Sequence, residues 1–331
     1  MSDDAEIVPH QEMMPIPIQD FISGVSVPVD LYVRLSDQKF ILLVKRGTKA
    51  SPDQMSSYKE KTVTYLWAKK SDYHMVSQQN IALAGVVVAK EQLSVKQKTR
   101  VLSTAANTVF HELEHIGLSL GAYQNARQVT EAVVTMLEHH KGFAALIESL
   151  NQHSDELLRH SMAVSVLSPI VGQALEWEKR ATLEKLALGG LLHDIGKKSL
   201  PPELLSKPKA QMSFEEHQLY ETHPFRGLEL LQTLGCVPDD VVSIVYEHHE
   251  NAIGQGFPQR LRDVKIHPLA RVVGLVDQFV NLTVRNVQSP NPKSPAEALV
   301  YMAHIMGQPY NKEVFRALEK VVTRQNGSHA A

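Results

Sequence analysis

The hydrophobic pattern of this chain changes its period once, near residue 92, and that change limits what the chain can fold into. Before it, apolar side chains alternate strictly in VSVPVDLYVRL (residues 25–35), which places them on one face of a strand. KFILLVKRG (39–47) and TVTYLWA (62–68) predict two further strands. Residues 1–20 are polar and contain three prolines, so we expect an arm there rather than a packed element.

After residue 92 the apolar residues recur at helical spacing, as at Leu102, Ala106 and Val109. We therefore expect a mainly α protein with a smaller mixed α/β module at its N-terminus. The module would span residues 1–150 as strands followed by helices, and an all-helical bundle would span 151–331. A chain of 331 residues with 43% hydrophobic content is large enough to give each part a core.

Composition and charge exclude several classes of function. The formal net charge is −2 and the pI is about 6.8, which gives no sign of a nucleic-acid polymer or an anionic membrane as partner. The single cysteine, Cys236, excludes an intrachain disulfide and a metal site built from thiolates alone. No basic start precedes an apolar run, and no apolar run reaches the ~18 residues of a membrane span. We therefore expect a soluble, cytoplasmic protein.

The segment HELEH, residues 111–115, matches the zinc-protease pattern H-E-x-x-H. The apolar stripe of its predicted helix runs through Val109 and Leu113, so that His111 and His115 point to the opposite face. The pattern also needs a third ligand and a cleft. A solvated helix face is the simpler interpretation, and we do not expect a metal here.

A second set of ionisable residues occupies apolar faces of predicted helices in the C-terminal half. In VVSIVYEHHE, His248 follows Val241, Ile244 and Val245 at the spacing of one helix face. A single histidine in such a position is most often a core residue that is satisfied by hydrogen bonds. Here, however, several such residues come from five separate predicted helices. They are Glu156, His160, His193, Asp194, His223, His248, His249 and Asp277.

Burying several carboxylates and imidazoles in an apolar interior is costly unless they are paired or bind a cation. Helical bundles build dinuclear metal sites by gathering such side chains from facing helices. Glu156 precedes His160 by four residues, so one helix face can offer both to one site. Imidazole and carboxylate ligands without thiolate suit iron, manganese or zinc, and the residue types alone do not choose among the three.

Local signals predict where the helices around these residues begin and end. Ser213 and Glu216 have the spacing of a capping box, and Gly235 suits the end of the helix that follows. Gly196 also suits a helix C-terminus, so the preceding His-Asp pair would lie in a last turn that faces a cavity.

Four segments follow one another in the order and spacing of the HD-GYP domain, namely HDIGKKSLPPELLSKP, THPFRGLELL, HHENAIGQGFP and ARVVGLVDQF. Through them, residues 150–320 or so resemble this bacterial branch of the HD phosphohydrolases. The resemblance implies an all-α HD fold with a centre of two or three divalent metal ions, commonly iron, that hydrolyses the second messenger cyclic di-GMP. No comparable resemblance covers the N-terminal half.

The resemblance also implies roles for individual residues. Asp194 would bridge two metals, Glu156 would be an additional ligand for a third metal, and Lys197 would stabilise developing negative charge or bind phosphate. Hydroxide formed from metal-bound water would attack phosphorus. Without the motif, Lys197 would be interpreted as a surface lysine after a helix end. The implied metal ligands are His160, His193, Asp194, His223, His248, His249 and Asp277.

The chain departs from the family pattern in its substrate-contacting segments. In HHENAIGQGFP, Ile253 stands where the family has aspartate and Phe257 where it has tyrosine. Phe257 could still stack on a base, but it cannot donate a hydrogen bond. After the final metal aspartate, Val280 replaces a second aspartate and Asn286 replaces an arginine. Arg285 is one position away and is a candidate substrate contact, although on a helix it would point elsewhere.

Two functions are therefore open. The first is a metal-dependent phosphodiesterase that acts on cyclic di-GMP or a related cyclic nucleotide. The second is a catalytically weak, metal-containing signalling module that binds nucleotide or a partner protein, with the N-terminal module as input or docking surface. The intact ligand set favours the first, and the altered loop favours the second.

Overall fold

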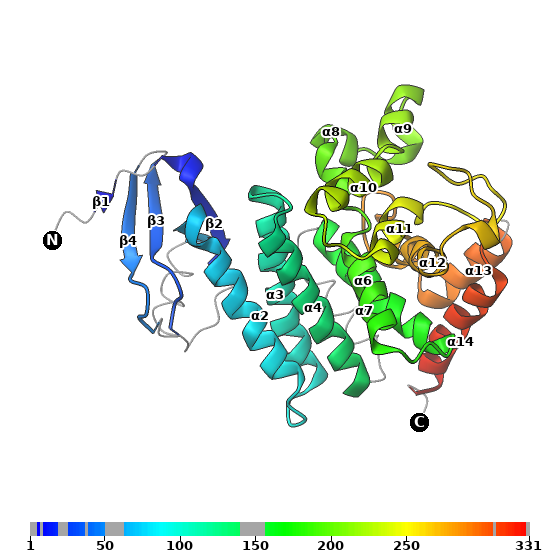
Figure 1. The fold of residues 1–331 in the computed structure, drawn as a ribbon, viewed down its shortest axis with the longest axis horizontal. Coiled ribbons are helices and arrows are strands. Elements are labelled where there is room, and N and C mark those ends of the chain that lie inside the picture. The colour runs from blue at the N-terminus through cyan, green and yellow to red at the C-terminus, as the bar shows by residue number, and fades with distance from the viewer. Residues whose placement is uncertain are drawn as a thin grey trace. The chain divides into compact units, whose positions relative to one another are not determined.

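The structure of the chain is a computed structural model that describes most of its residues (Figure 1). The chain divides into two compact units, one formed by Met1–Lys90 with Arg100–Val129 and the other by Glu91–Thr99 with Thr130–Ala331. The predicted domain boundary at residue 150 lies outside the described residues. Those residues are 5–6, 9–18, 26–36, 39–49, 63–139, 156–306 and 309–328.

The N-terminal unit contains a five-stranded antiparallel sheet with the strand order β1-β4-β3-β5-β2. The core on one face of this sheet includes Met14 and Leu66, together with Tyr73 and Val76 from the first turn of α2. The strands are β1 (Ala5–Glu6), β2 (Met13–Pro17), β3 (Leu31–Ser36), β4 (Lys39–Val44) and β5 (Tyr65–Lys69), and the helices that follow are α2 (Tyr73–Val88), α3 (Val95–His115) and α4 (Leu120–His139).

The arm predicted over residues 1–20 is wrong in part, because β2 lies within it and is largely buried. β2 is at the edge of the sheet and pairs with β5 alone, so its two prolines remove few ladder hydrogen bonds. The strands predicted over 39–47 and 62–68 are confirmed as β4 and β5. The strand predicted over 25–35 is shorter than expected, since β3 begins only at Leu31.

The described residues from 156 onward form helices and turns, as their periodicity predicts. α6 packs against α7 and α12, and α11 packs against α7, α10 and α12. None of the described helices is both long and apolar enough to cross a bilayer. The helices are α6 (Glu156–Ala174), α7 (Arg180–Leu192), α8 (Pro202–Leu205), α9 (Phe214–Tyr220), α10 (His223–Leu234), α11 (Asp239–Glu247), α12 (Pro268–Thr283), α13 (Pro295–His304) and α14 (Lys312–Ser328), with 3-10 turns η4 (Ile195–Ser199), η5 (Lys209–Gln211) and η6 (Asp263–Lys265).

The predicted start of α9 and the predicted end of α10 are confirmed. The hydroxyl of Ser213 accepts a hydrogen bond from the Glu216 amide, and the Glu216 carboxylate accepts one from the Ser213 amide. α10 ends at Gly235, whose φ of 64° is in the left-handed region that glycine adopts without strain. The start of α9 and the end of α10 are therefore both marked by local sequence signals.

Gly196 allows a close approach of two backbone segments beside the predicted ligands. The helix end predicted at Gly196 comes earlier, because α7 ends at Leu192 and Gly196 lies in the 3-10 turn η4, which follows His193 and Asp194. A Cβ at this position would overlap the carbonyl oxygen of His223 and lie 2.5 Å from the amide nitrogen of Gly227. Only glycine lets η4 lie against α10 at this distance, and this contact brings the first ligand of α10 next to the pair after α7.

Candidate metal centre

The seven side chains implied as metal ligands lie in two neighbouring groups in the C-terminal unit. Within each group, one ligand atom per residue lies within 4.8 Å of the others. Helices α6, α7, α10, α11 and α12 each place at least one of them, inside or at the end of the helix. The first group is Asp194, His223, His248 and His249, and the second is His160, His193 and Asp277.

Asp194 lies between the two groups and presents one carboxylate oxygen to each. Its Oδ2 is 3.3 Å from Nε2 of His193 and 3.9 Å from Nε2 of His160. Its Oδ1 is 3.3 Å from Nε2 of His223 and 3.7 Å from Nε2 of His248. Asp194 could therefore contribute one oxygen to a cation in each group.

Three of the histidines are oriented by the same backbone contact. The Nδ1 atom of each contacts the carbonyl oxygen three residues earlier, at 2.8 Å for His193, 2.7 Å for His223 and 2.8 Å for His248. A carbonyl oxygen only accepts hydrogen bonds, so Nδ1 carries the hydrogen in each ring. In a neutral ring, Nε2 then has a free lone pair directed at the centre, as in metal-binding histidines.

These lone pairs and the carboxylates fit a cation. Burial lowers the pKa of His223 to about 4 and also lowers the pKa of His248, so both rings are neutral near pH 7. Their Nε2 atoms face Oδ1 of Asp194, and two acceptors that face each other without a hydrogen between them repel. Oδ1 of Asp194 and Nε2 of His249 are buried and have no hydrogen-bond partner among the described residues. A divalent cation in each group would satisfy these atoms.

The charges at the centre agree with this fit. Burial opposes ionisation of Asp194, but His193 and Lys197 outweigh it and hold the pKa of this carboxyl well below its usual range. Burial likewise opposes ionisation of Asp277, whose pKa is nevertheless held low by His160 and His193. His160 Nε2 lies 2.9 Å from Asp277 Oδ1. Both carboxylates are therefore charged and available as ligands.

His193 differs from the other histidines of the centre. Burial opposes its protonation, but Asp194 and Asp277 outweigh this effect and raise the pKa of His193 to about 10. Without a cation, this ring would hold a proton that partly neutralises the carboxylates. Metal binding would displace that proton, as is usual where a cation competes with protons for histidine.

Lys197 lies within the centre rather than on the surface. Its Nζ is 2.5 Å from Oδ2 of Asp194, and its side chain is 18% exposed. Burial opposes its charge, but Asp194 outweighs burial and raises the pKa of Lys197 above its usual range. The ammonium therefore stays protonated beside the carboxylate that faces both groups.

Glu156 lies outside both groups. It is exposed at the start of α6, and its Oε1 accepts a hydrogen bond of 3.0 Å from the amide of Val287. Its role as a ligand of a third metal therefore stays a prediction.

In α3, His111 and His115 are stacked on each other at 5.6 Å between ring centres, and Nδ1 of His115 contacts the carbonyl oxygen of His111 at 3.1 Å.

The positions where the family has polar substrate contacts are occupied by structural residues. The Asn286 amide donates hydrogen bonds to the carbonyl oxygens of Asn281 and Val284, and its oxygen accepts two from the backbone amides of residues 288 and 289. The side-chain amide of Asn286 is thus fully hydrogen-bonded within the turn after α12. Val280 is 1% exposed and belongs to the core. Arg285 is exposed, and its role as a substrate contact stays a prediction.

The loop after α11 places Phe257 against the centre. The ring of Phe257 is half-buried, with its centre 4.5 Å from that of His249 and 6.1 Å from that of His223. At Gly256, a Cβ would overlap the carbonyl oxygen of His249, so glycine is required for the loop to return this closely. Ile253, at the tip of the loop, is 47% exposed. The ring at position 257 is therefore positioned for stacking, without a polar group.

Glu250 organises this loop, a role that the sequence did not indicate. Its side chain is 9% exposed, and its two oxygens accept hydrogen bonds from the amides of Gln259 at 2.6 Å and Leu261 at 2.7 Å. Burial raises the pKa of Glu250, and these amides oppose the rise. The only signal in the sequence is that Glu250 follows the two histidines directly.

We expect Glu250→Gln to lower the free energy of unfolding by about 1–3 kcal/mol, because one acceptor oxygen becomes an amide group facing a backbone donor. Urea unfolding of the purified variant measures the change. Glu203→Gln, on an exposed glutamate of α8, is the control and should cost little. Equal stability of the two variants would mean that the carboxylate does not hold the loop.

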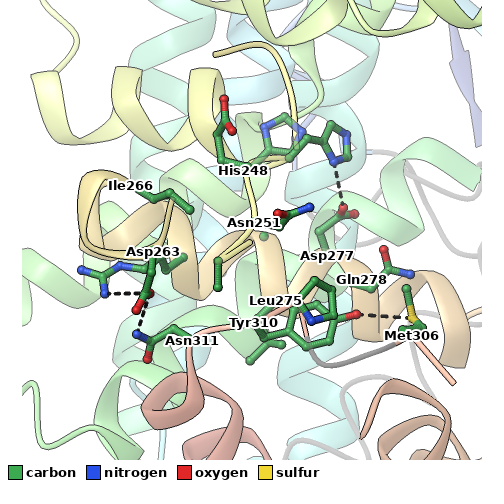
Figure 2. A pocket seen from close by; sticks show the side chains of 16 residues that line it. His248, Asn251, Asp263, Ile266, Leu275, Asp277, Gln278, Met306, Tyr310 and Asn311 are labelled. Atoms are coloured by element: carbon green, nitrogen blue, oxygen red, sulfur yellow. Dashed lines mark hydrogen bonds and ion pairs between the residues drawn. The ribbon is translucent and has the colours of Figure 1, made fainter. Parts of the chain in front are cut away.

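A cavity of about 180 Å³ lies beside Asp277, between the loop after α11 and the segment that joins α13 and α14 (Figure 2). Asn251, Gln278 and Tyr310 line it with uncharged polar groups. The Tyr310 hydroxyl donates to the thioether of Met306 at 3.3 Å, which is a weak acceptor. Burial and the charge of Asp277 raise the pKa of Tyr310, so the phenol keeps its hydrogen. No sequence motif marks Tyr310.

Opposite Asp277, the cavity is lined by Asp263, which forms a hydrogen bond and an ion pair with neighbouring side chains. Asp263 accepts a hydrogen bond of 2.8 Å from the Asn311 amide, and Arg271 Nη1 lies 3.6 Å from the same carboxylate oxygen (Figure 2). The cavity is smaller than the ~300–1,000 Å³ of pockets that enclose a drug-sized ligand. It therefore has room for only part of a dinucleotide.

Comparison with known proteins places this centre in a family. The HD domain family matches residues 144–314, which is more than half of the chain. A cyclic di-GMP phosphodiesterase of Pseudomonas aeruginosa is 32% identical over 196 residues, covering 59% of this chain and 46% of that protein. One from Thermotoga maritima is 28% identical over 183 residues, covering 54% of this chain and 49% of that protein. The chain spans about half the length of these relatives.

Two further similarities concern substrate and fold. A 3′3′-cGAMP-specific phosphodiesterase of Vibrio cholerae is 31% identical over 135 residues, covering 40% of this chain and 28% of that protein. A solved structure, that of an HDG"Y"P protein from Bdellovibrio bacteriovorus, matches with a TM-score of 0.68 and 20% identity. That match covers 94% of this chain and 99% of the other, so the two share a fold. The chain belongs to the HD domain family.

Proposed function

We propose that this chain is a metal-dependent phosphodiesterase that hydrolyses cyclic di-GMP or a related cyclic dinucleotide. The observation that carries the proposal is the position of Asp194. Its two oxygens face two groups of histidines that could each hold a metal ion. The names of the relatives support the substrate class, since they act on cyclic di-GMP or on 3′3′-cGAMP.

The proposed centre holds two divalent cations, one in each group, with iron, manganese and zinc all suited to the ligands. Such cations supply Lewis-acid chemistry, in that they neutralise charge on phosphate oxygens and lower the pKa of water. Hydrolysis adds water across one P–O ester bond, so that phosphorus gains an oxygen and the departing ribose oxygen gains a proton. The product is a linear dinucleotide.

In this proposal, the chain's own side chains hold and orient the phosphodiester. Lys197 keeps a positive charge beside Asp194 Oδ2 and is placed to stabilise negative charge on a phosphate. The Phe257 ring, next to the rings of His223 and His249, offers a surface on which a base can stack. Glu250 keeps the loop that carries this ring closed on the centre.

Phe257→Tyr is expected to raise kcat/KM for cyclic di-GMP by roughly threefold to tenfold, because a phenol would restore a hydrogen bond worth ~1 kcal/mol. Initial rates of the metal-loaded variant measure this change. Phe214→Tyr, on a ring that is 71% exposed in α9, adds the same group away from the centre and should leave the rate unchanged. An unaltered rate for Phe257→Tyr would mean that Asn286 or the geometry of the loop limits activity more than the missing hydroxyl does.

A second function is favoured by one observation, the full use of the Asn286 amide in its own turn. In that case the chain would bind a cyclic dinucleotide without appreciable turnover, and residues 1–150 would act as a regulatory module. The distinguishing experiment incubates metal-loaded protein with cyclic di-GMP and with 3′3′-cGAMP and follows the linear products. Hydrolysis of either supports the phosphodiesterase, whereas tight binding without product supports the second function.

A further inference from the structure

We propose, on the basis of the phosphodiesterase function above, that Lys209 binds the second phosphate of the cyclic dinucleotide, the one that does not lie at the metal centre. A cyclic dinucleotide has two phosphodiesters, and the centre accounts for one of them. Asn286 stands where the family pattern has an arginine, so this position offers no cation for the other phosphate.

Lys209 shares an aromatic platform with the lysine of the centre. Its Nζ lies 4.6 Å from the centre of the Tyr220 ring, and Nζ of Lys197 lies 5.4 Å from the same point. Lys197 has Asp194 as its counter-charge, but no ion pair joins Lys209 to a carboxylate in the described part of the chain. Two like charges beside one ring repel, and an anion between or beside them would relieve the repulsion.

A row of rings connects Lys209 with the proposed substrate loop. The Tyr220 ring is 5.0 Å from that of His223, which is 4.9 Å from that of His249. Phe257 follows at 4.5 Å from His249. Lys209 therefore lies at one end of this row and Phe257 at the other, with two predicted metal ligands between them. A ligand held at the metals can reach a cation at the Tyr220 end.

The backbone at Lys209 is hydrogen-bonded to the turn after α12, which contains Asn286. The Gln288 side chain accepts a hydrogen bond of 2.8 Å from the Lys209 amide, and the backbone amide of Gln288 donates to Asn286 at 2.8 Å. Met212, just after η5, packs with Tyr220 in one apolar cluster. The segment is thus anchored at the amide of Lys209 and at Met212. Asn286 shapes the turn that positions Lys209 instead of providing the charge itself.

The chemistry of the side chain suits this role. Lysine presents a compact charge on a flexible stem and binds phosphate without demanding a planar partner. Lys209 is half-buried, and its ammonium lies over the Tyr220 ring. A substrate with one phosphodiester and no second phosphate has no group for this site, so the site would contribute to the binding of dinucleotides and not to that of such a substrate.

The test compares cyclic di-GMP with bis(p-nitrophenyl) phosphate, which carries one phosphodiester, on the metal-loaded full chain. We expect Lys209→Met to raise KM for cyclic di-GMP by about tenfold to a hundredfold. Its rate on bis(p-nitrophenyl) phosphate and its metal content should equal those of the unaltered chain. Lys209→Arg should restore most of the lost affinity, and Gln288→Ala should raise KM to a smaller extent.

Lys207→Met is the matched control, because Lys207 is nearby but is paired with Glu216 at 2.6 Å. It should leave both substrates unaffected. An unchanged KM for cyclic di-GMP in Lys209→Met would overturn the inference, and so would an equal loss on both substrates. If the unaltered chain hydrolyses neither substrate, the proposed function fails by itself, and calorimetric binding of cyclic di-GMP decides the role of Lys209. Equal affinities of the two proteins would then overturn it.

Discussion

Asp194→Asn is expected to slow hydrolysis by roughly a thousandfold and to remove most of the bound metal. The carboxylate presents one oxygen to each group of histidines, so an amide at this position loses a ligand on one side and the negative charge on both. A loss of ~4 kcal/mol of charge stabilisation corresponds to roughly a thousandfold in rate. Steady-state rates with cyclic di-GMP, together with metal content per chain, measure both effects.

Asp240→Asn is the control for this variant. Asp240 pairs with Lys185 at 2.5 Å and lies 3.1 Å from Nε2 of His267, so it is also a carboxylate in contact with a histidine. It lies outside the two ligand groups, and a partly exposed ion pair contributes only ~0–1 kcal/mol. Its activity and metal content should stay near those of the unaltered chain. Full metal retention in Asp194→Asn would contradict a bridging role.

Gly196→Ala is expected to have the second large effect, on folding and on metal binding together. The added methyl group would overlap the carbonyl oxygen of His223, and backbone atoms cannot rotate away as a side chain can. Overpacking of this kind costs about 1–3 kcal/mol. Because the displaced segments carry Asp194 and His223, metal affinity should fall as well. Urea unfolding and metal titration measure the two effects.

Gly85→Ala provides the matched glycine. Gly85 is exposed in α2, and a Cβ there would meet no atom within 4 Å. Replacing an exposed helical glycine by alanine stabilises a protein by roughly 0.5–1 kcal/mol. Opposite signs for the two variants would support the close approach at Gly196. A Gly196→Ala chain as stable as the unaltered one would show that η4 can move away from α10 at little cost.

Much of the fold follows from local patterns in the sequence. The helical period after residue 92, the capping box at Ser213 and the glycine at 235 depend on neighbours within one or two turns, and the structure has all three. The change of period was placed too late, however, because helix α2 already begins at Tyr73. The candidate site could also be predicted from the sequence, because ionisable residues on apolar helix faces are costly to bury unless they pair or bind a cation. Their common location could be inferred, since they occur on several helices of one bundle.

The features that the sequence did not indicate depend on distant partners. Strand β2 contains two prolines and was expected to be an arm, but its pairing with β5 depends on residues 48 to 56 positions further along the chain. Tyr310 comes from the segment before α14 and meets Asp277 only through the packing of the bundle. The amide of Asn286 holds its own turn, a role that its identity alone does not specify. In each case the information lies in a contact between segments.

Element-resolved metal analysis of the purified chain tests the central claim most directly. The two ligand groups predict about two divalent ions per chain, with Asp194→Asn well below this value and Asp240→Asn close to it. A chain that carries well under one ion and takes up none of iron, manganese or zinc on reconstitution would contradict the claim.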